Sequence, residues 1–374
     1  MKKFAVLNLV LVLSLLLGTA ALAQEGDFGV VQRTTDAALD GWKPVISADA
    51  LYENLNDGDT SNDPFIVSVR APDAYALGHI PGAINIPWTQ IAKPESLAQL
   101  PTDKPIVVYC YTGHTGQAAA TVLKSLGYDV QNLKFGMMGW TLNDEVLGTT
   151  RFGPDTDARD YPTETTANEA TETYDYPVLD TGADDPTEIV RIAADAALDG
   201  WKPVIGADAL FENLNDGDTS NDPVVVSVRA ADVYALGHIA GAINIPWTQI
   251  AKPENLAKLP ADKPIVVYCY TGHTGQAAAT VLKMLGYDVQ NLKYGMMGWT
   301  LDDEVLGTGR YDPATAPDYP VVGTAVEEEA EAETEAPETV PETGGMAFPV
   351  EGLLLGFGTL TAAAGLYLRR RKAA

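Results

Sequence analysis

Hydrophobic residues occur along this chain in short runs that alternate with longer amphipathic stretches. The runs at 65–69, 83–86, 105–109 and 130–133 are too short for helices and rich in β-branched residues, which predicts buried strands. The stretches 48–55, 72–77 and 117–126 have helical spacing, and Gly127 is placed to end the last of them. Alternation of strands and helices predicts an α/β fold with a mostly parallel sheet.

The whole pattern returns 159 residues later in the chain. Residues 36–151 match residues 195–310 at about nine positions in ten. The repeated unit is much longer than the repeats of solenoid proteins and has the size of a complete domain. We therefore expect two near-identical domains, at 36–151 and 195–310.

Both ends of the chain carry sorting patterns rather than domain patterns. Residues 1–23 combine two lysines, an apolar run and a small-residue cleavage site, which predicts a secretory signal peptide. Residues 346–374 contain an apolar stretch followed by a basic cluster, which predicts a membrane anchor. This end also resembles a sortase cell-wall sorting signal, with Val340 where that pattern has Leu. Either alternative predicts an extracytoplasmic protein, tethered by its C-terminal segment to membrane or cell wall.

The net charge is −27, from 51 acidic and 24 basic residues. Such acidity argues against nucleic-acid binding, which needs clustered Lys and Arg. Most of the excess charge lies in two unrepeated segments that are poor in aliphatic residues, 152–194 and 311–345. This composition predicts a disordered linker and a disordered stalk. The charge therefore says little about the substrate.

The two cysteines of the chain occupy equivalent positions in the two repeats. Cys110 follows the strand at 105–109 and precedes a short loop and a helix, and Cys269 repeats this arrangement. A loop at the carboxyl end of a parallel strand directs backbone N–H groups toward a bound anion. The helix N-terminus also favours thiolate over thiol. We predict reactive cysteines that attack an oxyanion such as thiosulfate, in loops formed by Thr112, Gly113, His114, Thr115 and Gly116, and by Thr271, Gly272, His273, Thr274 and Gly275.

Three segments of the first repeat, which recur with few changes in the second, are similar to those of the rhodanese family. They are the Cys-x-x-Gly-x-Thr loop, the segment from Val69 to Pro87 that contains Gly-His-Ile-Pro-Gly-Ala, and the segment Gly136-Met137-Met138-Gly139-Trp140. The resemblance implies two domains, each with a mostly parallel five-stranded sheet flanked by helices. It further implies that the cysteine takes sulfane sulfur from a small sulfur-containing anion, becomes a persulfide, and passes the sulfur to a thiol or cyanide. The same resemblance allows a substrate contact for Arg70 and Arg229, with structural pairing as the alternative. No metal or organic cofactor is expected.

The sequence departs from the usual family pattern at two places in each repeat. Ser68 and Ser227 stand where the family usually has Asp, and Thr115 and Thr274 close loops that many members close with Arg. We expect these changes to go together, because a buried Asp without a cationic partner is costly. A phosphatase is disfavoured, because the loop is one residue too short and lacks the Arg that cradles phosphate.

Alternatives remain open for several residues and for the function itself. His114 and His273 either point outward or attract an anionic donor. His79 and His238 are expected to be structural. The alternative to an enzyme is a surface-displayed rhodanese-fold module that binds partners or carries sulfur without turnover.

Overall fold

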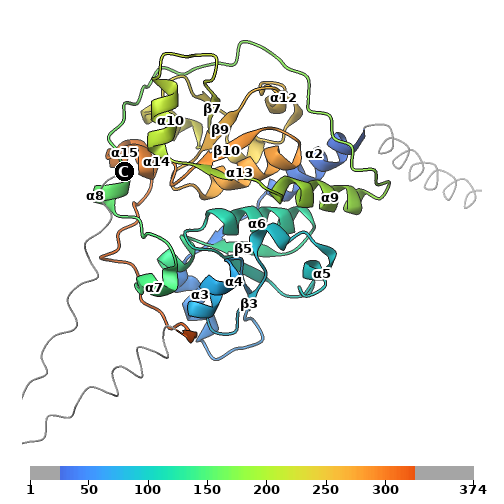
Figure 1. Ribbon diagram of the computed structural model, residues 1–374, viewed down its shortest axis with the longest axis vertical. Coiled ribbons are helices and arrows are strands. Elements are labelled where there is room, and N and C mark those ends of the chain that lie inside the picture. Colours follow the sequence, from blue (N-terminus) through green and yellow to red (C-terminus); the bar gives the residue numbers. More distant parts are fainter. Residues whose placement is uncertain (1–25, 325–374) are drawn as a thin grey trace, which may run out of the picture. The chain divides into compact units, whose positions relative to one another are not determined.

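Each repeat forms a parallel five-stranded sheet in the computed structural model, which describes residues 26–324 (Figure 1). The first sheet has the order β1-β5-β4-β2-β3 and the second the order β6-β10-β9-β7-β8. The strands of the first are β1 (Val45–Ile46), β2 (Phe65–Ser68), β3 (Ile84–Asn85), β4 (Ile106–Tyr109) and β5 (Val130–Leu133). Those of the second are β6 (Val204–Ile205), β7 (Val224–Ser227), β8 (Ile243–Asn244), β9 (Ile265–Tyr268) and β10 (Val289–Leu292). The predicted α/β fold with two such sheets is confirmed.

The central strand β4 is buried on both faces, as its unbroken apolar sequence predicts. Its side chains alternate between two hydrophobic cores: Ile106 and Val108 contact one, and Val107 and Tyr109 contact the other. Backbone pairing is in register with β2 on one side and β5 on the other. The strand therefore ends at a fixed depth in the domain, and Cys110 follows at its carboxyl end.

Helices cover both faces of each sheet. The first repeat contains α3 (Ala48–Leu55), α4 (Pro72–Leu77), α5 (Pro94–Leu97), α6 (His114–Ser125) and α7 (Asp144–Leu147), with 3₁₀ turns at Trp88–Gln90 and Gly136–Gly139. The second contains α10 (Ala207–Leu214), α11 (Ala231–Leu236), α12 (Pro253–Leu256), α13 (His273–Met284), α14 (Met296–Trp299) and α15 (Asp303–Leu306), with a 3₁₀ turn at Trp247–Gln249. Helix α6 begins three residues earlier than the hydrophobic spacing predicts, so its first turn belongs to the cysteine loop.

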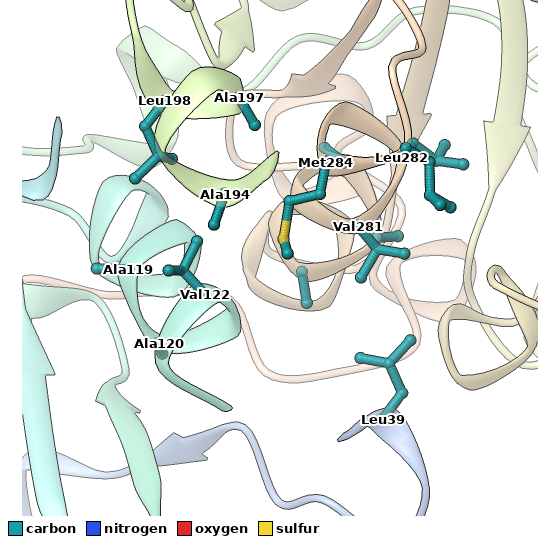
Figure 2. Close-up of a cluster of buried hydrophobic side chains, with 14 of the residues drawn as sticks. Leu39, Ala119, Ala120, Val122, Ala194, Ala197, Leu198, Val281, Leu282 and Met284 are labelled. Atoms are coloured by element: carbon teal, nitrogen blue, oxygen red, sulfur yellow. The ribbon is translucent and has the colours of Figure 1, made fainter. Parts of the chain in front are cut away.

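The two repeats pack against each other through the helices that follow their cysteine loops. Helix α6 contacts α13, and two helices that precede the repeats, α2 (Gly26–Leu39) and α9 (Pro186–Leu198), contact each other beside them. Figure 2 shows the small side chains of this interface, including Ala119, Ala120 and Val122 of α6. All three are fully buried, and alanine lets two helices approach closely. One hydrophobic core thus runs through both repeats.

The segment after each repeat lies against the other repeat. We call residues 159–168 the first strap and residues 318–324 the second strap. In the first strap, Tyr161 stacks on Phe211 of the second repeat with ring centroids 4.0 Å apart. In the second strap, Tyr319 stacks on Tyr52 of the first repeat, also at 4.0 Å.

Both straps also pair with backbone of the repeat they cover. Glu164 bridges His238 and Val322 bridges His79, each through two hydrogen bonds of about 2.9–3.0 Å. This differs from the disorder expected for 152–194 and for the start of 311–345. One tyrosine anchors each strap, Tyr161 or Tyr319, although the acidic composition of these segments predicts disorder. The end of the expected linker belongs to α9 (Pro186–Leu198). The rest of the expected stalk, residues 325–345, lies outside the described residues.

Within residues 26–324, no helix is long and apolar enough to cross a membrane. The predicted signal peptide at 1–23 and the predicted anchor or sorting signal at 346–374 lie outside the described residues. The short helix α8 (Pro154–Asp157) lies between the first repeat and the first strap.

Candidate active site

Cys110 lies at the carboxyl end of β4 with its side chain held inside a tight loop. Its Sγ accepts a hydrogen bond of 3.1 Å from the backbone N–H of Gly113, and the residue is 1% exposed. Gly113 has a φ of 93°, a left-handed conformation that a residue with a Cβ adopts only at a cost. This conformation turns the chain from the strand into α6, whose N-terminal end then faces the sulfur.

The 3₁₀ turn that follows β5, Gly136–Gly139, holds the backbone of the cysteine loop through hydrogen bonds. The N–H groups of Met137 and Met138 donate to the carbonyls of Cys110 and Tyr111, both at 2.9 Å. Gly136 allows this approach, because a Cβ at that position would lie 2.4 Å from the carbonyl oxygen of Cys110. The Gly-Met-Met-Gly-Trp segment is therefore a support for the loop.

The buried side-chain amides of Asn132 and Gln117 lie against the cysteine loop. Asn132 donates through Nδ2 to the carbonyl of Gly113 at 3.0 Å and lies 3.4 Å from Oε1 of Gln117. A Cβ on Gly116 would lie 2.3 Å from Oδ1 of Asn132, so Gly116 is required for this packing. Neither Asn132 nor Gln117 was among the site residues predicted from the sequence. Asn132 is a polar residue in a short strand that begins and ends with apolar residues, and Gln117 is a polar residue near the start of a largely apolar helix. These two features could have pointed to them.

His114 is buried at the interface between the repeats, and its ring does not point to solvent. Its Nε2 accepts a hydrogen bond of 3.0 Å from the backbone N–H of Tyr294 in the other repeat. Burial, with a smaller contribution from Lys293, lowers the pKa of His114 to about 3. The ring is therefore neutral at physiological pH, and the expectation that it attracts an anion by its charge is not supported.

The neutral ring of His114 orients a hydroxyl in the loop. Because Nε2 accepts a hydrogen bond, the proton of the ring lies on Nδ1, which is 3.0 Å from Oγ1 of Thr112. Thr112 then accepts from the ring and keeps its own hydroxyl proton for another acceptor. The loop of one repeat is thus tied to the backbone of the other through a single imidazole.

Arg70 is fully buried and bonds to the protein itself. Its guanidinium donates to the carbonyls of Val146 and Gly78 and lies close to the rings of Tyr109 and Tyr111. Burial lowers the pKa of Arg70. It is not among the residues that line the cavity at Cys110, so this geometry favours the structural alternative for Arg70 over substrate contact.

Ser68 lies beside that guanidinium, with Oγ 3.5 Å from Nε of Arg70. An Asp at this position would therefore have a cationic partner. We expected Ser68 and Thr115 to have changed together because an Asp at position 68 would lack a cationic partner. Arg70 is such a partner, so this expectation is wrong in its reason.

A cavity of about 210 Å³ opens over Cys110. The loop contributes Cys110, Tyr111, Thr112, His114 and Thr115 to its lining, and the segment after α7 contributes Gly148 and Thr149. Val204 and Lys293 come from the other repeat. Of the predicted site residues in this loop, Thr112, His114 and Thr115 line the cavity, while Gly113 and Gly116 shape the backbone around it.

The second repeat reproduces the loop geometry around Cys269. Gly272 donates to Sγ at 3.1 Å, Asn291 donates to the carbonyl of Gly272 at 3.0 Å, and His273 accepts from the N–H of Phe135 at 3.0 Å. Burial lowers the pKa of His273 well below its usual value. Equivalent positions are occupied by Thr271, Thr274, Gly275 and the buried Arg229. Both cysteines are free thiols.

Comparison with known families identifies the fold of both repeats. The model of the rhodanese-like domain matches residues 47–143 and 207–302, about half of the chain. The chain belongs to the rhodanese-like domain family. Both matches include the cysteine loop and the closing Gly-Met-Met-Gly-Trp segment, so the resemblance inferred from those motifs is confirmed.

This rhodanese-like protein is similar to several curated proteins over one repeat. A sulfurtransferase from Allochromatium vinosum is 32% identical over 96 residues, which cover 25% of this chain and 85% of that protein. An HTH-type transcriptional regulator from Mycobacterium tuberculosis is 40% identical over 79 residues, which cover 21% of this chain and 34% of that protein. The chain thus spans about a third of the regulator.

Solved structures give similar matches. A rhodanese-like domain protein from Staphylococcus aureus is 28% identical, with a TM-score of 0.23, over 25% of this chain and 87% of that one. A thiosulfate sulfurtransferase from Pseudomonas aeruginosa is 16% identical, with a TM-score of 0.27, over 79% of this chain and 50% of that one.

Proposed function

We propose that this rhodanese-like protein is a sulfurtransferase that carries sulfane sulfur as a persulfide on Cys110 and on Cys269. The observation that carries the proposal is the position of each sulfur. It lies at the end of a central strand, it accepts a backbone N–H at 3.1 Å, and it faces the N-terminal end of a twelve-residue helix. Backbone N–H groups in this arrangement stabilise negative charge on sulfur or on a bound anion.

Thiosulfate is the donor that this chemistry fits best. The thiolate attacks the outer sulfur of thiosulfate, a new S–S bond forms at the cysteine, and the old S–S bond breaks. Its electron pair leaves with sulfite, so a thiolate and thiosulfate become a persulfide and sulfite. Attack of cyanide or a thiolate on the outer sulfur of the persulfide then transfers that sulfur and restores the cysteine thiolate.

The neighbours of Cys110 have separate tasks in this reaction. Gly113 N–H stabilises the thiolate before attack and the sulfur anion after transfer. The hydroxyl of Thr112, oriented by His114, is available to an oxygen of the donor. The buried Asn132 keeps the loop in the conformation that points these groups at the sulfur. The signal peptide expected at 1–23 supports a location of the reaction outside the cytoplasm.

Formation of thiocyanate from thiosulfate and cyanide tests the proposal. The purified protein should produce thiocyanate, and its Cys110→Ser/Cys269→Ser variant should not. Each single Cys→Ser variant should retain turnover, because both loops are complete. Thiocyanate production by the double variant would refute the mechanism. A wild-type protein that produces none, and gains no sulfur atom at either cysteine by mass spectrometry, would be a binding module instead.

A further inference from the structure

The cavity over Cys110 is built from both repeats. Seven of its lining residues come from the repeat that contains the cysteine, and Val204 and Lys293 come from the other one. Lys293 is the positively charged residue among those that line this cavity. The loop of Cys110 itself ends in Thr115, where many family members have Arg. The positive charge that this loop lacks is therefore present in the cavity wall, on a different domain.

Lys293 has no carboxylate partner among the ion pairs of residues 26–324. Its half-buried side chain lies over the ring of Tyr294, with Nζ 4.9 Å from the ring centroid. Its proximity to the loop is also seen in its effect on His114, because the charge of Lys293 contributes to the lowered pKa of that imidazole. An unpaired ammonium beside a buried thiol is suited to an anionic ligand.

The backbone at the interface is strained in a way that fixes this lysine. Tyr294 has a φ of 65°, an unusual value for a residue with a side chain. In this conformation its N–H reaches across the interface to Nε2 of His114. Strain of this kind persists where the surrounding structure requires it. Here the contact holds Lys293, the preceding residue, against the cavity of the neighbouring repeat.

The reciprocal contact is present at the other cysteine loop. Phe135 has a φ of 64°, and its N–H donates to Nε2 of His273 at 3.0 Å. The preceding residue is Lys134, whose charge contributes to the lowered pKa of His273. Each repeat therefore presents one lysine to the cysteine loop of its neighbour.

We propose that Lys293 binds the anionic end of the sulfur donor at Cys110, and that Lys134 does so at Cys269, so each active site is completed by the other repeat. The inference deepens the proposed sulfurtransferase function and rests on it. Lys293 acts by charge on the sulfonate oxygens of thiosulfate and on the sulfite that leaves. It takes no part in proton transfer or in the exchange of S–S bonds.

The two sites also differ in one residue at this contact. Tyr294 occupies the position beside Cys110, and Phe135 occupies the matching position beside Cys269. Burial raises the pKa of Tyr294, and the charges of Asp157 and Cys110 add to this effect. The two contacts between the repeats therefore differ by one buried hydroxyl group.

A single-site background tests the assignment. In a Cys269→Ser protein, which can react only at Cys110, Lys293→Gln should raise KM for thiosulfate by about tenfold, as expected for loss of a charge-assisted contact. Lys293→Arg should restore most of the loss. The exposed Lys43→Gln is the matched control for removal of one charge and should leave KM unchanged. In a Cys110→Ser protein, Lys134→Gln should have the larger effect.

Alkylation of the thiol separates failure of this inference from failure of the proposed function. We expect Lys293→Gln to lower the rate with iodoacetate about tenfold relative to the rate with the neutral iodoacetamide, whether or not the protein makes thiocyanate. An unchanged ratio and an unchanged KM in an active protein would overturn the inference and leave the sulfurtransferase function standing. A cysteine unreactive toward both reagents would also overturn it, because the proposed site must admit an anion.

Discussion

Acid should weaken the contact between the repeats, because each contains a buried neutral histidine. The pKa of His114 is about 3 in the folded protein and about 6.5 when the chain is unfolded. Between these values the unfolded state binds more protons than the folded state. Stability is therefore fully present above pH 6.5 and is lost as the pH falls toward 3.

The size of the effect follows from these two pKa values. Lowering the pH from 8 to 5 should reduce the free energy of unfolding by about 2 kcal/mol through His114 alone. His273, whose pKa is lowered for the same reason of burial, should add to the loss. The expected total is a large part of the stability of an ordinary domain.

Urea denaturation at pH 8 and pH 5 provides the assay. Replacement by His114→Gln removes the titrating group while keeping an amide oxygen that can accept the N–H of Tyr294. This variant should lose about 2 kcal/mol less than the wild type between the two pH values. The His79→Gln variant is the matched control, because His79 lies outside this contact and bonds to Tyr75. An equal loss in wild type and His114→Gln would refute the reasoning.

Three further changes test the supports of the loop and the straps. Gly136→Ala should lower the free energy of unfolding by more than about 2 kcal/mol and abolish cysteine reactivity, because the added Cβ would collide with the carbonyl of Cys110. Gly127→Ala is the control: it has open space around it and should cost only about 1 kcal/mol in urea denaturation. Asn132→Ala should reduce kcat about tenfold in the thiocyanate assay, because the carbonyl of the loop loses its donor; unchanged kcat would contradict this role. Tyr319→Ala should cost about 2 kcal/mol in urea denaturation, because its half-buried ring stacks on Tyr52; a loss below about 0.5 kcal/mol would show that the second strap contributes little.

The elements within each repeat could be predicted from local sequence. The apolar β-branched run at 105–109 gave β4, and the Cys-x-x-Gly-x-Thr loop after it indicated where chemistry would occur. These features depend on neighbouring residues, so the spacing of residue types was sufficient. The position of the loop at the start of α6 was also foreseen, although the helix begins at His114.

Contacts between distant parts of the chain could not be predicted in this way. His114 meets a backbone N–H 180 residues further along the chain, and no local pattern indicates that partner. The first strap was predicted to be disordered because the segment 152–194 is strongly acidic, yet its Tyr161 stacks on Phe211. Lys293 was not singled out, because its importance depends on the domain against which it packs.

The central claim, that sulfur is carried on the cysteines of both repeats, is tested most directly by mass spectrometry. The protein should be treated with thiosulfate, freed of excess reagent and analysed as intact chain and as peptides. We expect one added sulfur atom on Cys110 and one on Cys269, both removed by cyanide with formation of thiocyanate. Absence of added sulfur at both cysteines, or sulfur that cyanide does not remove, would contradict it.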